Sequence, residues 1–148
     1  MAEAPALPSA EELFCFTVYS TAHALNRAYK PLLDELGLTY PQFLVLIALW
    51  QKDARTVGGL GAVMHLDSST LTPLLKRMEV QNLVRRARNA ENERQVIVSL
   101  TSAGTALRAR ARDILPVIGC ATGLAPDALE ALRRQLGGVR DALDASTA

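Results

Sequence analysis

The sequence is poor in aromatic residues, cysteine and histidine, and it has no long hydrophobic run. Tryptophan, tyrosine and phenylalanine make up 5% of its 148 residues, and there are two cysteines and two histidines. Few aromatic residues beside abundant alanine, leucine and arginine favour a mostly helical fold. No run approaches the roughly 20 apolar residues of a transmembrane helix, so no membrane association is expected. The length suits a single domain over residues 1–148 with a core of its own.

The two histidines, His23 and His65, lie far from any cysteine or carboxylate at the spacing of metal ligands. The sequence also lacks a glycine-rich nucleotide loop, a Ser/His/Asp grouping and a pair of carboxylates suited to catalysis. It therefore predicts neither a metal site nor a cofactor, and it argues against an enzyme.

The N-terminal segment, residues 1–12, is acidic and contains proline, unlike the basic and apolar start of a signal peptide. We expect residues 1–8 to form a disordered arm and the protein to be cytoplasmic. In that compartment Cys15 and Cys120 would be reduced at rest, so a disulfide between them would form only under particular conditions.

The most informative stretch is LDSSTLTPLLKRM, residues 66–78. Its leucines and methionine recur at helical spacing as one apolar stripe, and hydroxyl and cationic side chains occupy the opposite face. Asp67 is placed to cap the helix. Such a helix can lie in a DNA major groove, although an ordinary amphipathic surface helix has the same pattern. The candidate DNA-contacting residues on it are Ser68, Ser69, Thr70, Thr72, Pro73, Lys76 and Arg77.

Two β-prone runs follow, residues 83–88 and 95–101, on either side of a polar turn. Alternate residues of the second run share an apolar face, as in a half-buried strand, so a β-hairpin is predicted. Residues 76–94 contain six basic and three acidic side chains, whereas the whole chain has a net charge of +1. Local charge governs phosphate binding, and it is concentrated here. Arg86, Arg88 and Arg94 are therefore further candidate DNA-contacting residues.

The first predicted helix is long. A capping pattern at Ser9 and Glu12 starts it, and it should run to about Leu36 with Gly37 as its stop. Pro31 lies inside this range and should kink or interrupt the helix, because proline removes one backbone hydrogen bond.

A helix-turn-helix is predicted between this helix and the hairpin. Residues 40–50 form a second helix, which is apolar on nearly every side and therefore buried. Residues 57–64 form a short third helix, and a tight turn at residues 65–66 leads into the helix that begins after it. We assign residues 38–100 to a winged helix-turn-helix that binds DNA.

Residues 101–119 are predicted to form a helix that breaks near Pro116 and Gly119, and Pro126 starts a last helix. The last helix has leucine and valine at steps of three and four residues, as in a coiled coil. The first helix also has an apolar stripe. Because both chain ends have such stripes outside the DNA-binding part, the sequence predicts a two-fold homodimer. The predicted dimerisation part comprises residues 9–37 and 101–148.

These features together resemble the MarR family of winged-helix repressors and, more narrowly, its OhrR branch of organic-hydroperoxide sensors. The similarity lies in residues 16–50, 66–79 and 93–101 and covers nearly the whole chain. It implies a mainly α-helical winged helix-turn-helix fold with a small β-hairpin. It also implies a homodimer on a pseudo-palindromic double-stranded DNA operator, with the recognition helix in the major groove and Arg94 in the minor groove.

The resemblance further implies how such a protein is switched. In this branch a cysteine near the start of the first helix senses the peroxide, and Cys15 matches it. Two tyrosines that match Tyr29 and Tyr40 hydrogen-bond the sulfur across the dimer, and Tyr19 matches a further aromatic residue of the sensing region. Cys120 matches the partner of the two-cysteine form. An organic hydroperoxide would therefore act as inducer by oxidising Cys15, which then forms a disulfide with Cys120 and releases the DNA.

One departure from the family lies in the turn of the hairpin. The family usually has aspartate before Glu-Arg, and this chain has Asn92. The loss of that carboxylate should loosen the turn or change the affinity for DNA.

Each candidate residue also has a plainer interpretation. A lone cysteine is commonly a small buried hydrophobic residue, and a tyrosine is commonly a core aromatic. Two other functions are consistent with parts of the sequence. One is a thiol peroxidase that uses both cysteines, although an enzyme has no need of a recognition helix. The other is a repressor that a small aromatic ligand releases, with a pocket lined by Phe14, Phe16, Tyr19 and Trp50.

Overall fold

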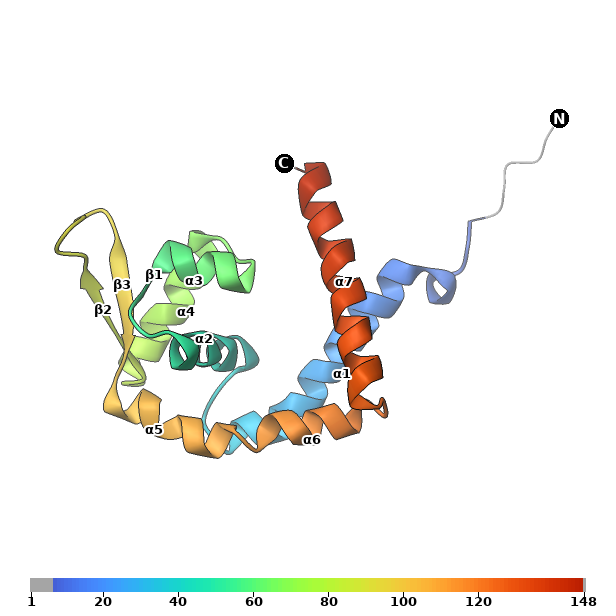
Figure 1. The fold of residues 1–148 in the computed structure, drawn as a ribbon, viewed down its shortest axis with the longest axis horizontal. Coiled ribbons are helices and arrows are strands. Elements are labelled where there is room, and N and C mark those ends of the chain that lie inside the picture. The colour runs from blue at the N-terminus through green and yellow to red at the C-terminus, as the bar shows by residue number, and fades with distance from the viewer. Residues whose placement is uncertain (1–6, 148) are drawn as a thin grey trace. The chain divides into compact units, whose positions relative to one another are not determined.

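The computed structural model describes residues 7–147, which form two compact units, one ending at Ala111 and the other beginning at Arg112. The predicted N-terminal arm lies almost wholly outside these residues. The fold is mainly α-helical with a small antiparallel sheet, as predicted (Figure 1). The first unit contains the 3₁₀ turn η1 (Ala10–Glu12), α1 (Phe14–Asp34), α2 (Tyr40–Gln51), β1 (Arg55–Thr56), α3 (Val57–Met64), α4 (Ser68–Val80), β2 (Val84–Arg88), β3 (Val96–Leu100) and α5 (Ser102–Ala111). The second contains α6 (Ile114–Ala121) and α7 (Pro126–Thr147).

The first helix begins later than predicted. The Ser9 N–H donates to Glu12 Oε2 at 2.8 Å, but this capping bond closes only the short turn η1. Leu13 then has an extended backbone (φ −82°, ψ 125°), and α1 starts at Phe14. The prediction of one continuous helix from Ser9 is therefore wrong at Leu13, and the break places Cys15 in the first turn of α1.

The end of α1 follows the prediction. Gly37 has φ +67°, a conformation that glycine adopts without strain. The Leu38 N–H donates to Leu33 O at 3.0 Å and closes the helix end. The helix runs through Pro31 as one α-helix, so the predicted interruption there does not occur.

The helix-turn-helix consists of α3 and α4, which pack on each other and on α2. The leucine stripe of α4 forms core as predicted, because Leu71, Leu75 and Met78 are all fully buried. The two helices approach closely at Gly61, where a Cβ would lie 2.6 Å from Leu66 O. Only glycine therefore fits at this position of the turn.

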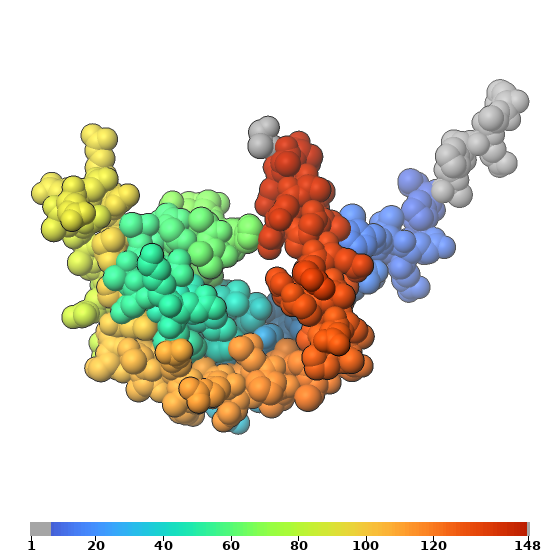
Figure 2. All heavy atoms as spheres, in the orientation of Figure 1, coloured from blue at the N-terminus to red at the C-terminus, as the bar shows by residue number. Residues whose placement is uncertain are grey.

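The predicted hairpin is present as β2 and β3, and β1 joins it to give the strand order β1-β3-β2. In the hairpin Val84 pairs with Leu100 and Arg88 pairs with Val96. The sequence did not predict β1, because a strand of two residues has no alternation to recognise. The hairpin, yellow in Figure 2, projects from the surface of this unit.

Thr101 and Gly104 fix α5 to the hairpin. Thr101 Oγ1 donates to Asn82 O at 2.6 Å and accepts from the Gly104 N–H at 3.0 Å, so its side chain caps the start of α5. A Cβ at residue 104 would collide with Leu83 O. The Trp50 indole N–H donates to Gly104 O at 3.0 Å, so the same residue also joins α5 to α2.

The helix predicted over residues 101–119 is in fact two helices, α5 and α6, separated at Arg112 and Asp113. Pro116 explains the break, because its ring excludes the carbonyl of the residue four positions earlier, Arg112, from helical bonding. Proline is accepted in the first turn of a helix, and Pro116 is the third residue of α6. The chain thus breaks four residues before Pro116, and Gly119 remains helical.

Within the second unit, α6 has two buried residues, Ile114 and Ile118, whereas α7 leaves its apolar side chains uncovered in the single chain. No residue of α7 is buried, although Leu132, Leu136, Val139 and Leu143 recur at helical spacing. Within residues 7–147, no single helix combines the length and the apolar character needed to cross a membrane. One helix pair, α6 and α7 with a bend of 89° between them, meets that criterion by length and composition alone.

Candidate functional site: recognition helix, hairpin and thiol

Asp67 holds the N-terminus of α4. Its Oδ1 accepts from the Ser69 hydroxyl at 2.6 Å and from the Thr70 N–H at 2.8 Å. These bonds, the one from Ser69 above all, hold the pKa of Asp67 below its usual value of 3.8. The cap therefore stays ionised at neutral pH, as a helix N-terminus favours. The candidate DNA-contacting residues around this turn are exposed, except Thr72, which is half-buried: Ser68, Ser69, Thr70, Thr72 and Pro73.

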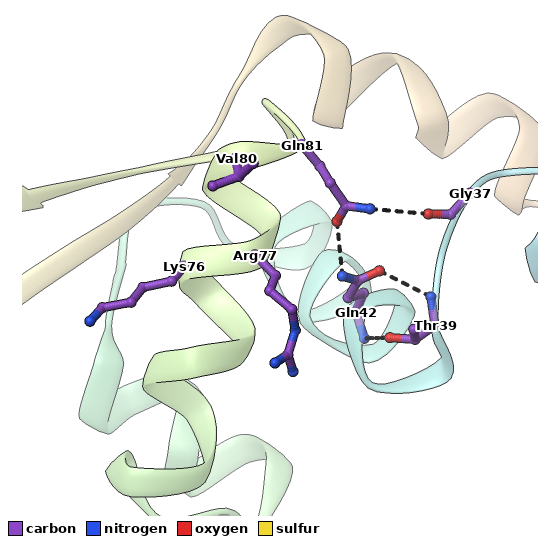
Figure 3. A pocket seen from close by; sticks show the side chains of 7 residues that line it. All are labelled: Gly37, Thr39, Gln42, Lys76, Arg77, Val80 and Gln81. Atoms are coloured by element: carbon purple, nitrogen blue, oxygen red, sulfur yellow. Dashed lines mark hydrogen bonds between the residues drawn. The ribbon is translucent and has the colours of Figure 1, made fainter.

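Lys76 and Arg77 continue the polar face of α4 (Figure 3). Both are exposed, and they border an open groove of about 490 Å³ that Val80, Gln81 and the start of α2 also line. In Figure 3 the Lys76 side chain points away from α2, whereas Arg77 extends alongside it. The face of α4 opposite its leucines is therefore cationic as well as hydroxylated.

Arg86 in β2 is held by Glu79 of α4. Its Nε and Nη2 donate to Glu79 Oε2 at 3.0 and 2.9 Å, and its backbone N–H donates to Oε1 at 3.1 Å. These bonds lower the pKa of Glu79. The pair joins the recognition helix to the hairpin and occupies the Arg86 guanidinium. Contact of Arg86 with DNA therefore stays a prediction, as it does for Arg88 and Arg94, which are exposed.

The turn of the hairpin is closed by backbone and side-chain hydrogen bonds. The Asn89 N–H donates to Gln95 O at 2.8 Å, and the Gln95 N–H donates to Asn92 O at 2.9 Å. Asn92 Oδ1 accepts from the Arg94 N–H at 3.2 Å. The amide oxygen thus forms the local turn that aspartate also forms, and the expected loosening at Asn92 stays a prediction. Its effect on DNA affinity stays a prediction.

Cys15 and Cys120 are free thiols, and both are exposed in the single chain. Cys15 is the second residue of α1, where unpaired backbone N–H groups and the helix dipole favour negative charge. Its neighbours Phe14, Phe16 and Val18 are also exposed, although all three are large and apolar. Cys120 is the last residue but one of α6. Neither thiol is the buried hydrophobic residue of the plainer interpretation.

Tyr29 of α1 and Tyr40 of α2 lie together, with ring centroids 4.6 Å apart. Tyr29 is only 8% exposed and also lies 6.0 Å from the ring of Phe43. Burial raises the pKa of both phenols above the ordinary 10.0, and the charge of Tyr40 raises that of Tyr29 further. Both hydroxyls therefore keep their protons at neutral pH and can donate hydrogen bonds.

The thiol and the tyrosine pair are far apart within one chain. Cys15 and Tyr29 are 14 residues apart on the same helix, and a rise of 1.5 Å per residue separates them by about 21 Å. Tyr19, one turn after Cys15, is 63% exposed and lies edge-on to His23 with ring centroids 4.4 Å apart. A site that contains both the Cys15 thiol and the pair of Tyr29 and Tyr40 would need a second copy of the chain.

The four aromatic residues considered for a ligand pocket do not share one environment. Phe14, Phe16 and Tyr19 are exposed on the first turns of α1. Trp50 is part of the packing between α2 and α5, because it donates to Gly104 O and its ring lies 6.4 Å from that of Phe43. Nothing in this arrangement favours release by a small aromatic ligand.

Two helices joined by a tight turn and followed by a projecting hairpin define a winged helix-turn-helix, a class of DNA-binding protein. Within that class, the chain belongs to the family of transcriptional regulators SarA/Rot, whose model matches residues 27–110.

Relatives agree with this assignment. The HTH-type transcriptional regulator TtmR of Methylorubrum extorquens (strain PA1) is 46% identical over 138 residues, which cover 93% of this chain and 70% of that protein. The organic hydroperoxide resistance transcriptional regulator of Bacillus subtilis (strain 168) is 48% identical over 104 residues, 70% of this chain and 71% of that protein.

A similar solved structure is that of overoxidised AbfR bound to DNA, with a TM-score of 0.73, 31% identity and coverage of 87% of this chain and 90% of that one. AbfR is a protein of Staphylococcus epidermidis. Together these findings confirm a MarR-type, DNA-binding transcriptional regulator. The family and these relatives are transcriptional regulators rather than enzymes, which argues against the thiol peroxidase alternative.

Proposed function

We propose that this protein is a homodimeric repressor that leaves its operator when an organic hydroperoxide oxidises Cys15. The observation that carries the proposal is that the two parts of a sensing site lie apart in one chain, on α1 and α2. One is an exposed thiol in the first turn of α1, and the other is the pair of protonated tyrosines, Tyr29 and Tyr40, about 21 Å further along. The proposal is supported by a 48% identical relative that is an organic hydroperoxide resistance regulator.

A two-fold axis beside the middle of α1 would bring the thiol of one chain to the tyrosine pair of the other. Residue 22 is midway between positions 15 and 29, so an antiparallel pairing of two α1 helices about Ala22 places each Cys15 opposite the partner subunit's Tyr29. The small side chain of Ala22 permits a close approach at the axis. The uncovered apolar residues on this stretch are those expected of an interface. They are Leu13, Phe14, Phe16, Val18 and Leu25.

The chemistry at Cys15 is a two-electron oxidation of sulfur. The thiolate attacks one oxygen of the hydroperoxide, an S–O bond forms and the O–O bond breaks. The leaving alkoxide takes up a proton and departs as an alcohol. Phenol hydroxyls beside the sulfur can donate hydrogen bonds to the thiolate and so hold it ready for attack.

Cys120 would then capture the oxidised sulfur. Its thiolate attacks the sulfenic acid of Cys15, an S–S bond forms and the hydroxyl leaves as water. A disulfide requires Cα atoms within roughly 7 Å, so this bond would hold the start of α1 and the end of α6 at that distance. We propose that the bond joins two subunits, changes the spacing of the two recognition helices and releases the DNA.

On DNA, the exposed face of α4 would lie in the major groove and Arg94 would reach the minor groove. The residues of α4 proposed to contact DNA are Ser68, Ser69, Thr70, Thr72, Pro73, Lys76 and Arg77, and those of the hairpin are Arg86, Arg88 and Arg94. A two-fold dimer presents two such surfaces, so its operator should be pseudo-palindromic, with half-sites about one helical turn apart.

The test compares operator binding by wild type, Cys15→Ser and Cys120→Ser before and after treatment with cumene hydroperoxide. Cys15→Ser should bind the operator in both conditions, because a serine hydroxyl is not a useful nucleophile at neutral pH. Cys120→Ser should still be oxidised at Cys15, stop at a sulfenic acid or a mixed disulfide, or proceed to the sulfinic form. The proposal is wrong if peroxide releases Cys15→Ser from DNA as it releases wild type.

A further inference from the structure

We propose that Gln42 and Gln81 transmit the state of the sensing tyrosines to the recognition helix. This inference rests on the proposed function and assigns a positioning role to two residues that contact neither the thiol nor DNA in that proposal. Gln42 lies on α2 and Gln81 directly follows α4. Their positions are 39 residues apart in the sequence, and no local pattern links them.

Gln42 is a buried amide with partners for both ends of its side chain. It is 4% exposed, its Oε1 accepts from the Thr39 N–H at 3.0 Å, and its Nε2 donates to Gln81 Oε1 at 2.9 Å (Figure 3). A buried amide that lost a partner would be costly, so these bonds restrict where the side chain can lie. The first turn of α2 is therefore tied to one position at the end of α4.

Gln81 extends the connection in two directions. Its backbone N–H donates to Arg77 O at 3.0 Å and ends α4, and its Nε2 donates to Gly37 O at 3.4 Å. Gly37 is the residue that closes α1. Three helix ends, those of α1 and α4 and the start of α2, thus meet in one hydrogen-bonded cluster beside the groove of Figure 3.

Tyr40 belongs to the same turn of α2 as Thr39 and Gln42, two members of this cluster. Thr39 caps α2, Tyr40 is its first residue and Gln42 its third, so all three belong to one turn. The Tyr40 ring faces Tyr29, whereas the Gln42 amide faces α4. A shift of this turn that follows a change at the thiol would therefore move the Tyr40 ring and the Gln42 amide together. Hydrogen bonds are directional, unlike the apolar packing between helices, so the amide pair can bias the orientation of the recognition helix.

The experiment measures how much operator affinity is lost on oxidation by cumene hydroperoxide, with oxidation of Cys15 followed by mass spectrometry. Gln81→Leu removes both side-chain hydrogen bonds of Gln81, whereas Gln81→Glu keeps the acceptor for Gln42 Nε2 and loses only the bond to Gly37 O. Gln51→Leu alters an exposed glutamine at the other end of α2 and serves as control. Gln81→Leu should bind DNA like wild type when reduced and be oxidised like wild type. Its loss of affinity on oxidation should be at least about tenfold smaller, a size typical of coupling between sites. Gln81→Glu and Gln51→Leu should respond as wild type does.

Two outcomes would overturn the inference. In one, oxidised Gln81→Leu releases the operator as completely as wild type, so the bridge carries no signal. In the other, folded and reduced Gln81→Leu fails to bind, so the bridge only supports the helix. A failure of the proposed function is different, because wild type itself would then keep its operator after oxidation.

Discussion

The helix-turn-helix and the two chain ends differ in how their apolar side chains are covered. The helices α4 and α7 both have leucines at helical spacing, yet four residues of α4 are buried and none of α7 is. Leu75 is fully buried, whereas Leu136 is 40% exposed. The first half of α1 resembles α7, since its buried residues begin only at Tyr29. The helix-turn-helix supplies its own core, whereas the first half of α1 and all of α7 lack one in the single chain.

This difference supports the proposal that the sensor is divided between two chains. Burial of a leucine or phenylalanine side chain contributes about 1.5–3 kcal/mol. Covering the exposed residues of α1 and α7 with a second copy of the chain would therefore strongly favour association. Cys15 lies among those residues, and the tyrosine pair lies where the self-contained core begins. Formation of the dimer and assembly of the sensor would therefore be the same event.

The largest effect is expected in the core of the helix-turn-helix. Leu75→Ala should lower the free energy of unfolding by about 2–5 kcal/mol, because it leaves a cavity in a fully packed site. Urea denaturation monitored by far-ultraviolet circular dichroism measures this loss. The loss should be the same at every protein concentration, and Lys76→Ala at the next, exposed position should have little effect. A loss below about 1 kcal/mol would show that α4 is not held by its own leucines.

The chain ends should respond in their assembly instead. Leu136→Asp places a carboxylate in the proposed interface, which should weaken the dimer by about 3 kcal/mol, or roughly a hundredfold in dissociation constant. Analytical ultracentrifugation measures that constant, and Trp50 fluorescence reports whether the first unit stays folded. Leu136→Met, which stays apolar, is the control. A well-folded Leu136→Asp dimer of unchanged affinity would remove α7 from the interface.

Loss of single cations should affect DNA binding alone. Lys76→Ala and Arg94→Ala should each weaken operator binding by about 1–3 kcal/mol, while the dimer and the free energy of unfolding stay the same. Each lost phosphate contact should also flatten the slope of log K against log salt by about one unit. Arg133→Ala, on α7, is the matched control. Fluorescence anisotropy with labelled operator at several salt concentrations measures the affinity and the slope. If both variants bind like wild type, the assignment of Lys76 and Arg94 to DNA contact is wrong.

The smallest effect concerns the tyrosine pair. Burial raises the pKa of Tyr29 above 10.0, so the folded state holds this proton more tightly than the unfolded state does. The contribution of this hydroxyl to the free energy of unfolding is therefore fully present below about pH 10. It falls as the pH rises toward the pKa of the folded state. Tyr29→Phe should reduce that decline, and Tyr19→Phe, at an exposed position, should not. Urea denaturation at about pH 8 and pH 10.5 compares them, and identical declines would argue against burial of the Tyr29 hydroxyl.

Local features of the fold were predictable because their causes lie within a few residues of each other. The leucine stripe of α4, the cap at Asp67 and the stop at Gly37 each depend on spacings of five residues or fewer. The break at Leu13 and the position of the break before Pro116 were missed. In the second case the sequence identified the cause, but the steric effect of proline acts four residues earlier, at Arg112.

Contacts between distant segments were not predictable from spacing. The Glu79–Arg86 ion pair, the Gln42–Gln81 hydrogen bond and the pairing of β1 with β3 depend on how the helices pack. The tyrosine pair was anticipated only through resemblance to a family, because nothing in the spacing of Tyr29 and Tyr40 indicates that their rings meet.

Mixed dimers of Cys15→Ser and Cys120→Ser subunits test the division of the sensor most directly. After the two variants exchange subunits, each mixed dimer retains one Cys15 in one subunit and one Cys120 in the other. We predict that cumene hydroperoxide converts only the mixture, and not either variant alone, into a covalent dimer on a non-reducing gel, and that the covalent dimer does not bind the operator. If the mixture forms no covalent dimer while oxidised wild type runs as a monomer with an internal disulfide, the proposed sensor does not span two subunits.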